Sequence, residues 1–310
     1  MSETNPPLIE APKKRGPIIV AVVLVLALVA ALAYFLTRDD DSEAGAAGTK
    51  VRIGIVSEGE EYWQDFVDAA AAEDIDVELV NFANYELANP ALANGEIDLN
   101  QFQHVVFLAQ HNANTGDDLT PIGSTAVYPL SMYSDKVDSP SEIKDGDKVV
   151  VPNDATNQAR ALLILESLDL ITLKDGGNAF STLADVDKDA SKVSVTPVSA
   201  ELTPTSIKDV AAVVINNDFV TKAGLDFDDA IFADDPKAES TRPYVNIFAA
   251  RAEDKDNETF RKLVEIYQND EKVQQGVLDA SGGTANLLKT PAADLQSTLA
   301  TVQADAENAN

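Results

Sequence analysis

The pattern of apolar and polar positions from residue 51 onward predicts short strands that alternate with helices. The run Val51–Val56 predicts a strand, the amphipathic stretch up to Ala72 predicts a helix, and Val77–Phe82 predicts a second strand. The same alternation continues as helix 87–93, strand 97–102, helix 105–111 and strand 122–128. Such an order is typical of an α/β fold with a mostly parallel sheet, whose ligands bind at the carboxyl ends of the strands.

A second α/β set follows the extended segment 128–134. It contains predicted strands at 148–151, 193–198 and 210–215 and a helix at 157–168. A long extended segment, 244–254, and two amphipathic helices, 258–268 and 271–280, are expected to return to the first lobe. We therefore expect lobe 1 at 51–130 and 245–288, lobe 2 at 131–244, and two crossings that make a hinged cleft. The tail 289–310 is rich in Ala, Gln and Asn and is expected to be loosely ordered.

The N-terminal part of the sequence predicts a membrane anchor. The uncharged run Pro17–Leu36 is long enough, at ~1.5 Å per helical residue, to cross a hydrocarbon core of roughly 30 Å. A cleavable signal peptide is the alternative, but its apolar region usually has ~7–15 residues. The basic cluster Lys13–Arg15 places residues 1–16 in the cytoplasm, so the linker 37–50 and everything after it are expected outside the membrane.

Composition excludes several classes of function. The net charge is -29, which disfavours a nucleic-acid partner, because neutralising phosphates requires clustered cations. The absence of cysteine excludes disulfides, thiolate metal sites, cysteine nucleophiles and lipid attached to a cysteine. Two histidines seven residues apart make a metal site improbable, and no GxSxG, GxGxxG or Walker motif appears. We expect no enzyme, no cofactor and no metal.

The junction Val151–Leu165 has the features of an anion site. A strand ends at Pro152, and Asp154 or Thr156 is placed to cap a helix whose first N–H groups face the strand end. Asn157 and Arg160 lie three residues apart on one helical face, and a guanidinium beside helix N–H groups fits a small carboxylate. An ordinary capped helix with a surface arginine is the alternative interpretation.

Further polar and aromatic residues lie at other predicted strand ends. Phe102 and His104 leave one strand together, and Phe107 on the next helix faces the same crevice. Asn216 ends another strand, and Asn246 begins the long segment that crosses back. Aromatic residues beside strands more often pack in the core, and such asparagines are more often turn residues. Their convergence on strand ends favours a cleft.

Six motifs together resemble the methionine-binding, substrate-binding proteins of ABC importers, the NlpA or MetQ lipoprotein family. The resemblance covers Val51 to Leu288 and rests on motifs in the family's order: FQH at 102–104, VYP at 127–129, VPND with TN and R at 151–160, LITLKDG at 170–176, VIN at 214–216 and YVN at 244–246.

This resemblance implies a two-lobed, type II-like periplasmic-binding-protein fold and a set of ligand contacts. Arg160 is implied to bind the ligand carboxylate, while Asn216 and Asn246 bond the amino-acid backbone. The side chain is implied to be wrapped by aromatic residues and a histidine: Tyr85, Phe102, His104 and Phe107. A thioether gains from contacts with aromatic rings, which agrees with this arrangement.

Three features depart from the family's pattern. Members are typically acylated on an N-terminal cysteine, whereas this chain has a predicted membrane helix. The family's Lys-Pro-Tyr after FQH is replaced by Val105, Val106 and Phe107, which removes a hydroxyl donor. The family's glycine-proline turn after the first strand is replaced by residues 57–64, where Glu58, Glu60 or Glu61 is expected within reach of a ligand ammonium group.

These features predict a membrane-tethered receptor that captures methionine, D-methionine or a methionine dipeptide and passes it to an ABC permease and its ATPase subunits. The alternative is an anchored extracytoplasmic amino-acid sensor or interaction domain that keeps the cleft and serves no transporter.

Overall fold

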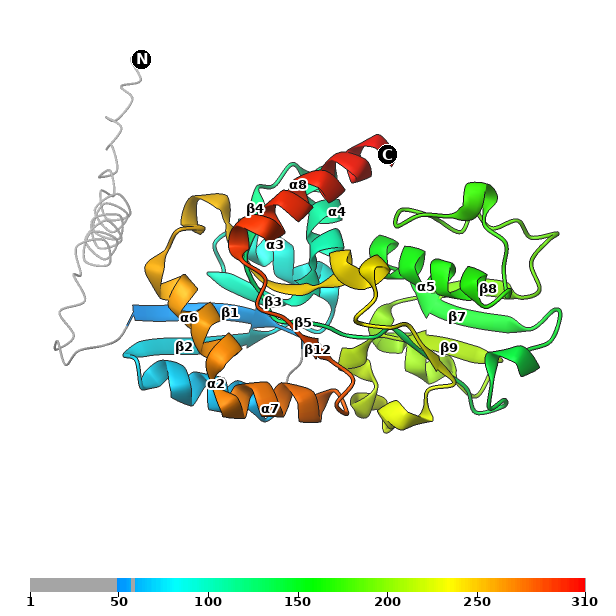
Figure 1. Ribbon diagram of the computed structural model, residues 1–310, viewed down its shortest axis with the longest axis horizontal. Helices are drawn as coiled ribbons and strands as arrows, with labels where there is room; N and C mark the ends of the chain where they lie inside the picture. The colour runs from blue at the N-terminus through cyan, green and yellow to red at the C-terminus, as the bar shows by residue number, and fades with distance from the viewer. Residues whose placement is uncertain (1–48, 57–58, 310) are drawn as a thin grey trace, which may run out of the picture. The chain divides into compact units, whose positions relative to one another are not determined.

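A computed structural model of the chain describes residues 49–56 and 59–309 (Figure 1). Its strands form two five-stranded sheets and one two-stranded ladder. We call the elements around the sheet β2-β1-β3-β11-β4 the first lobe, and those around the sheet β10-β6-β9-β7-β8 the second lobe. The predicted membrane helix at 17–36 lies outside the described residues. None of the helices that the structure describes is long and apolar enough to cross a bilayer.

The sheet of the first lobe is mostly parallel, as predicted. β1 pairs with β2 and β3 in parallel, whereas β11 enters antiparallel between β3 and β4. The strands of this lobe are β1 (Thr49–Ile55), β2 (Ile75–Asn81), β3 (Leu99–His104), β4 (Leu119–Ser124) and β11 (Asn246–Arg251). Its helices are α2 (Tyr62–Ala71), α3 (Ala88–Ala93), α4 (Val105–Thr115), α6 (Glu258–Asn269), α7 (Glu271–Ala280) and α8 (Ala292–Ala309).

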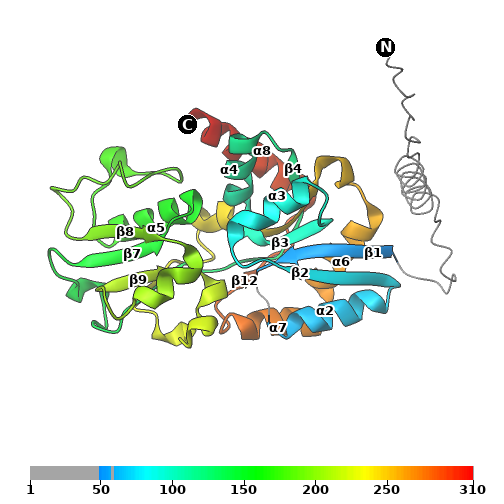
Figure 2. The ribbon, with the colours of Figure 1, turned by 180° about the vertical axis from the view of Figure 1, so that it is seen from behind.

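Helices cover both faces of this sheet, and the alternation of side chains along β11 shows why. Phe248 and Ala250 belong to the core beneath α2, α6 and α7, while Ile247 and Ala249 belong to the core beneath α3, α4 and α8. Figures 1 and 2 show these two groups of helices on opposite sides of the sheet. A strand buried on both faces reads as a continuous apolar run, as residues 247–250 do.

The second lobe has one crossover helix against its sheet. The parallel strands β7 (Lys148–Pro152), β8 (Ser194–Val198) and β9 (Ala212–Ile215) are joined by antiparallel β6 (Ser131–Tyr133) and β10 (Phe232–Ala233). α5 (Ala155–Ser167) packs its apolar face on this sheet through Ala161, Leu162 and Leu165. Short 3₁₀ helices make up much of the remainder of this lobe, among them η4 (Ala200–Ser206), η5 (Asn217–Phe219) and η8 (Glu239–Tyr244), while η1 (Tyr85–Leu87) belongs to the first lobe.

The chain passes between the sheets in two places, at 128–130 and at 234–245. Beside the first of these segments, β5 (Ala126–Val127) pairs with β12 (Asn286–Leu287), so the chain after α7 lies against it. The carboxyl end of β3 belongs to the first sheet and those of β7 and β9 to the second, and residues at all three line one cavity near these crossings. This arrangement places the cavity described below.

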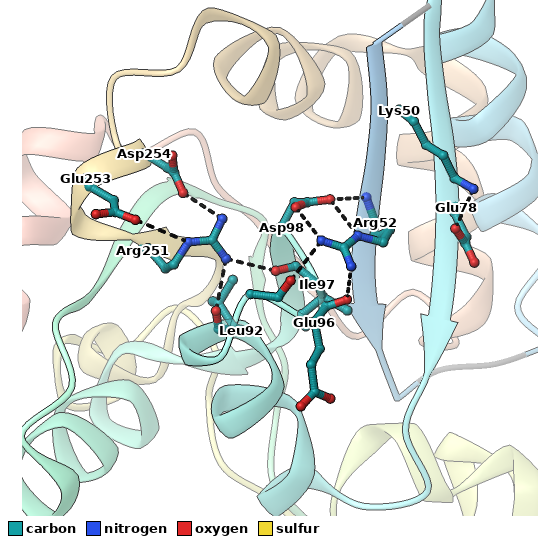
Figure 3. Close-up of polar contacts among 11 residues, drawn as sticks. Lys50, Arg52, Glu78, Leu92, Glu96, Ile97, Asp98, Arg251, Glu253 and Asp254 are labelled. Carbon is teal, nitrogen blue, oxygen red and sulfur yellow. Dashed lines mark hydrogen bonds and ion pairs between the residues drawn. The ribbon is translucent and has the colours of Figure 1, made fainter. Parts of the chain in front are cut away.

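Two arginines fix the loop that leads into β3. Arg52 on β1 binds both carboxylate oxygens of Asp98, with N···O distances of 2.9 and 3.1 Å. Arg251 on β11 donates to the carbonyl oxygens of Leu92 and Ile97 and pairs with Asp254 at 2.7 Å. Figure 3 shows both guanidinium groups directed at this loop from opposite sides. The start of β3, and so the position of its carboxyl end, is held by charged hydrogen bonds to two neighbouring strands.

The C-terminal segment differs from the expectation of a loosely ordered tail. Residues 292–309 form α8, which lies against α4 and β4 (Figures 1 and 2). Leu295 and Leu299 are buried in the core of the first lobe, and Val302 packs against it. Spacings of four and three residues put these side chains on one face of a helix, and burial of that face outweighs the polar composition.

We expect Leu295→Ala to lower the free energy of unfolding by about 2–4 kcal/mol, because it removes buried methyl groups and leaves a cavity. Leu295 is 1% exposed. The matched control is Ser297→Ala, an exposed position on the same helix, which should change stability by less than about 0.5 kcal/mol. Urea denaturation followed by circular dichroism measures both, and equal stability of the two variants would show that α8 does not support the fold.

Candidate functional site

A cavity of about 50 Å³ lies where the strand ends of the two lobes meet. All eight side chains singled out in the sequence line it. Those from the first lobe are Tyr85, Phe102, His104, Phe107 and Asn246, and those from the second lobe are Asn157, Arg160 and Asn216. The structure therefore brings together residues that lie as much as 161 positions apart in the chain (246 minus 85).

The wall from the first lobe is aromatic. Tyr85 stacks on Phe102 with ring centroids 5.8 Å apart, and Phe107 meets both rings edge-on at 6.2 and 5.7 Å. Phe219 of the second lobe approaches Tyr85 at 5.4 Å. Offset and edge-on contacts of this kind stabilise one arrangement of the rings, so the wall is preformed.

His104 ends β3 and caps α4. Its Nδ1 accepts a hydrogen bond from the backbone N–H of Phe107 at 3.1 Å, so the proton of the neutral ring lies on Nε2. Nε2 faces the side-chain oxygen of Asn157 across the cavity at 3.3 Å. Burial, and then the charge of Arg160, lower the pKa of His104 to about 3. The ring is therefore a neutral part of the wall at physiological pH.

Of the two capping residues proposed from the sequence, Asp154 caps α5. Asp154 accepts hydrogen bonds from the backbone and side-chain N–H groups of Asn157, at 2.9 and 3.0 Å. The protein's own carboxylate thus occupies the helix N-terminus, and of the junction only Asn157 and Arg160 line the cavity. Asp154 thus satisfies one of the N–H groups that we expected to be free for an anion, that of Asn157, and the anion site at this junction stays a prediction that rests on Arg160.

Arg160 is held by a partner that the sequence did not reveal. Its Nε and Nη2 donate to the two carboxylate oxygens of Asp234 at 2.8 and 2.9 Å, and Nη2 also donates to the carbonyl oxygen of Tyr128 at 3.0 Å. The guanidinium carbon lies 4.5 Å from the ring centroid of Tyr244. Within the described chain no group accepts a hydrogen bond from Nη1. This nitrogen of the guanidinium is therefore left for a ligand.

The end of β9 supplies a run of oxygen atoms. Asn216 follows the strand, and Asn217 and Asp218 begin η5; all three line the cavity. The hydroxyl of Tyr85 donates to Asp218 at 2.6 Å and so joins the two lobes. Burial raises the pKa of Asp218 above its usual value, and the bond from Tyr85 and the charge of Lys222 offset only part of that rise.

Asn246 begins β11 opposite His104 in the ladder. With its amide nitrogen facing β3, it donates to the carbonyl oxygens of Phe102 and Gln103 at 3.3 and 3.2 Å. This orientation fixes the side chain and turns its oxygen away from those carbonyl groups. The first lobe thereby contributes one polar acceptor beside its aromatic wall.

Sequence reasoning missed several lining or supporting residues. Asp234 lies in the pair Asp234–Asp235, and in so acidic a chain such a pair is typical of solvated surface. Asp218 is equally hard to distinguish from a surface carboxylate in the sequence. Tyr128 and Tyr244 are part of the VYP and YVN motifs, so the motifs themselves were the available signal. Neither Glu60 nor Glu61 lines this cavity, contrary to expectation, and Glu58 lies outside the described residues.

We expect His104 to stay neutral well below pH 6.5. The unfolded chain takes up a proton near that pH and the folded chain does not, so stability is lost as the pH falls. Relative to His104→Gln, the wild type should lose about 1.5–2 kcal/mol between pH 6.5 and about pH 5. Unfolding free energies at the two pH values test this. A nuclear magnetic resonance titration that protonates His104 near pH 6.5 would contradict it.

Comparison with known proteins identifies the family that this chain resembles. The model of the NlpA lipoprotein family matches residues 51–286. The chain is 36% identical over 242 residues to "Probable D-methionine-binding lipoprotein MetQ" of Haemophilus influenzae, covering 77% of this chain and 87% of that protein. It is 35% identical to "D-methionine-binding lipoprotein MetQ" of Escherichia coli K12, covering 83% and 94%.

A solved structure has the same fold. A nutrient-binding protein from Burkholderia cenocepacia, described as bound to methionine, superposes with a TM-score of 0.71 at 31% identity and covers 76% of this chain and 99% of its own. The two-domain α/β substrate-binding fold is therefore shared along nearly the whole length of that protein. On the match of the family model and the identity to its relatives, this chain belongs to the NlpA lipoprotein family.

Proposed function

We propose that this protein is an extracytoplasmic solute receptor that captures methionine or a close derivative and delivers it to an ABC permease with its ATPase subunits. The observation that carries the proposal is a single cavity in which Arg160 lies beside a wall of aromatic rings. The family and the names of the relatives support the same ligand class. The protein binds the ligand and performs no chemistry on it.

In this proposal the second lobe binds the carboxylate. Nη1 of Arg160 donates to it, while Asp234 and Tyr244 hold the guanidinium plane. Asn157 lies one helical turn before Arg160 and already faces His104, so it closes the cavity beside the carboxylate. Asn216 and Asn246 supply amide groups to the amino-acid backbone.

The first lobe selects the side chain. The rings of Tyr85, Phe102 and Phe107 offer faces and edges to a thioether, which is apolar and polarizable. The neutral ring of His104 adds a fourth wall without a competing charge. Phe107 has no hydroxyl, so this wall is apolar along the edge where a tyrosine would donate a hydrogen bond.

Ligand capture is proposed to involve movement of the lobes about the segments at 128–130 and 234–245. We propose lobe boundaries at 51–130 with 245–288 and at 131–244. Polar contacts outside these segments also join the lobes, among them Tyr85 to Asp218, His104 to Asn157, and Lys222 to the carbonyl oxygen of Val56 at 2.9 Å. A ligand that touches both lobes favours the closed form over the open one.

We further propose that residues 17–36 anchor the protein to the cell membrane as a single helix, with the binding domain outside. The relatives are named lipoproteins, but this chain has no cysteine to carry a lipid. The uncharged run has the length and flanking charges of a membrane span. Tethering is thus retained with a different attachment.

Replacing Arg160 by Ala should weaken methionine binding roughly 30-fold or more, because it removes the charged partner of a buried carboxylate. Calorimetry of the full chain in detergent measures the affinity. Arg242→Ala, which removes an exposed arginine paired with Glu239, should leave the affinity unchanged. The double variant Arg160→Ala with Asp234→Ala removes both charges, so it separates loss of binding from instability caused by an unpaired Asp234.

Ligand binding and delivery to the permease are tested separately, because an amino-acid sensor would bind the ligand without delivering it. Binding of L-methionine, D-methionine or a methionine dipeptide, lost in both Arg160 variants, supports the ligand site. Stimulation of ATP hydrolysis by the reconstituted permease in the presence of ligand and receptor tests delivery. If no amino acid raises the melting temperature of the wild type, the solute-receptor proposal is wrong.

The anchor predicts membrane retention of the full chain. The wild type should remain in the membrane pellet after a high-salt wash, whereas a chain that begins at residue 49 should be released. Leu26→Arg with Val29→Arg should reduce insertion, because each arginine near the centre of a span costs about 2.5–3.5 kcal/mol, and Leu26→Ala is the control. Release of the wild type by salt alone would exclude a membrane-spanning anchor.

A further inference from the structure

Three consecutive residues after β9 line the cavity and carry side-chain oxygen atoms: Asn216, Asn217 and Asp218. The side-chain oxygens of both asparagines are buried, and neither has a hydrogen-bond partner in the described chain. A buried acceptor without a donor is costly, and each such group in a folded protein requires an explanation. We call these three residues the acceptor cluster.

Asp218 makes this cluster an acceptor of hydrogen bonds. An amide can turn either its oxygen or its nitrogen toward a ligand, but an ionised carboxylate only accepts hydrogen bonds. Its Oδ2 accepts a hydrogen bond from the hydroxyl of Tyr85 at 2.6 Å. Among the described residues, no lysine or arginine forms an ion pair with it, and the amino group of Lys222 instead donates to the carbonyl oxygen of Val56.

A ligand that brings a negative charge into the cavity favours a cation beside Asp218, since Lys222 acts on Asp218 through its charge but forms no ion pair with it. The positive charge of Arg160 is already matched by the bidentate contact with Asp234. A ligand carboxylate placed on Nη1 adds a second negative charge to a buried region that also contains Asp218. A protonated amine on the same ligand cancels the charge that the ligand carboxylate adds, and burial makes that compensation valuable.

We propose that the acceptor cluster binds a protonated amine of the ligand and that Asp218 makes the receptor select amine-bearing ligands over N-acylated ones. This inference rests on the proposed function and adds a specificity determinant to it. Asn216 and Asn217 supply amide oxygens to the amine, and Asp218 supplies the charge that an N-acylated ligand cannot neutralise.

Two positions of the amine share this chemistry. A series of ring contacts runs from the Asp218 partner Tyr85 through Phe107 and His104 to Tyr244, which lies on Arg160. In an α-amino acid the amine lies beside the carboxylate. In a dipeptide the amine lies one peptide unit further from the carboxylate, in the direction of Tyr85. L-methionine and glycyl-L-methionine represent the two cases.

The experiment compares affinities of the full chain in detergent for L-methionine, glycyl-L-methionine and N-acetyl-L-methionine. The measured quantity is the ratio of the Kd for N-acetyl-L-methionine to the Kd for each amine-bearing ligand. Asp218→Asn removes the charge and keeps the shape, so this ratio should fall about tenfold or more for the ligand whose amine meets the cluster. Asp228→Asn, at an exposed position of the same lobe, should leave it unchanged.

Each result has one meaning. A ratio that changes less than about threefold in Asp218→Asn overturns the inference, including the case in which all ligands weaken alike because only the contact with Tyr85 was lost. The proposed function survives that outcome if the wild type binds methionine and the Arg160 variants do not. Absence of wild-type binding to all three ligands overturns both. Asp218→Ser, a second charge-free variant, repeats the comparison if Asp218→Asn melts well below the wild type.

Discussion

The buried contact between Arg160 and Asp234 is the constraint around which the rest of the cavity is arranged. Removing a guanidinium from water is expensive unless its donors find acceptors, and here two of its nitrogens and both carboxylate oxygens are satisfied. Asp234 also accepts the backbone N–H of Leu130 at 2.9 Å, and Arg160 donates to Tyr128. The pair therefore joins α5 to both segments that pass between the lobes, and its position fixes the single free edge of the fork.

This constraint extends to the opposite wall. A protonated histidine beside Arg160 would add a second buried positive charge, and burial together with that charge lowers the pKa of His104 to about 3. His104 instead uses one nitrogen to cap α4 and the other to face Asn157. Because the first lobe meets the arginine with neutral groups, the lobes approach closely without repulsion. The loop before β3, held by Arg52 and Arg251, keeps this neutral wall in place.

Local patterns in the sequence predicted most of the elements and a large part of the site, for physical reasons that also explain the omissions. β7, α5 and the end of β3 follow from β-branched runs, a capping residue and helical spacing, all of which act over a few positions. Asp234 lies 74 residues from Arg160, and nothing local distinguishes it from other acidic residues. The polar composition of residues 289–310 indicated a loosely ordered tail. The four- and three-residue spacing of Leu295, Leu299 and Val302 was the better signal, since it places all three on the buried face of α8.

The distribution of charge between the lobes suggests how binding is coupled to closure. Both ionic features of the cavity, the Arg160–Asp234 pair and Asp218, belong to the second lobe, whereas the first lobe contributes aromatic rings and neutral polar groups. On the proposed function, the polar end of an amino acid can bind the second lobe first, since its contacts are complete there apart from Asn246. The side chain then remains exposed to water until the aromatic wall covers it. Burial of a thioether against Tyr85, Phe102 and Phe107 thus supplies the free energy that favours the closed form, so a ligand without such a side chain would bind without driving closure as strongly.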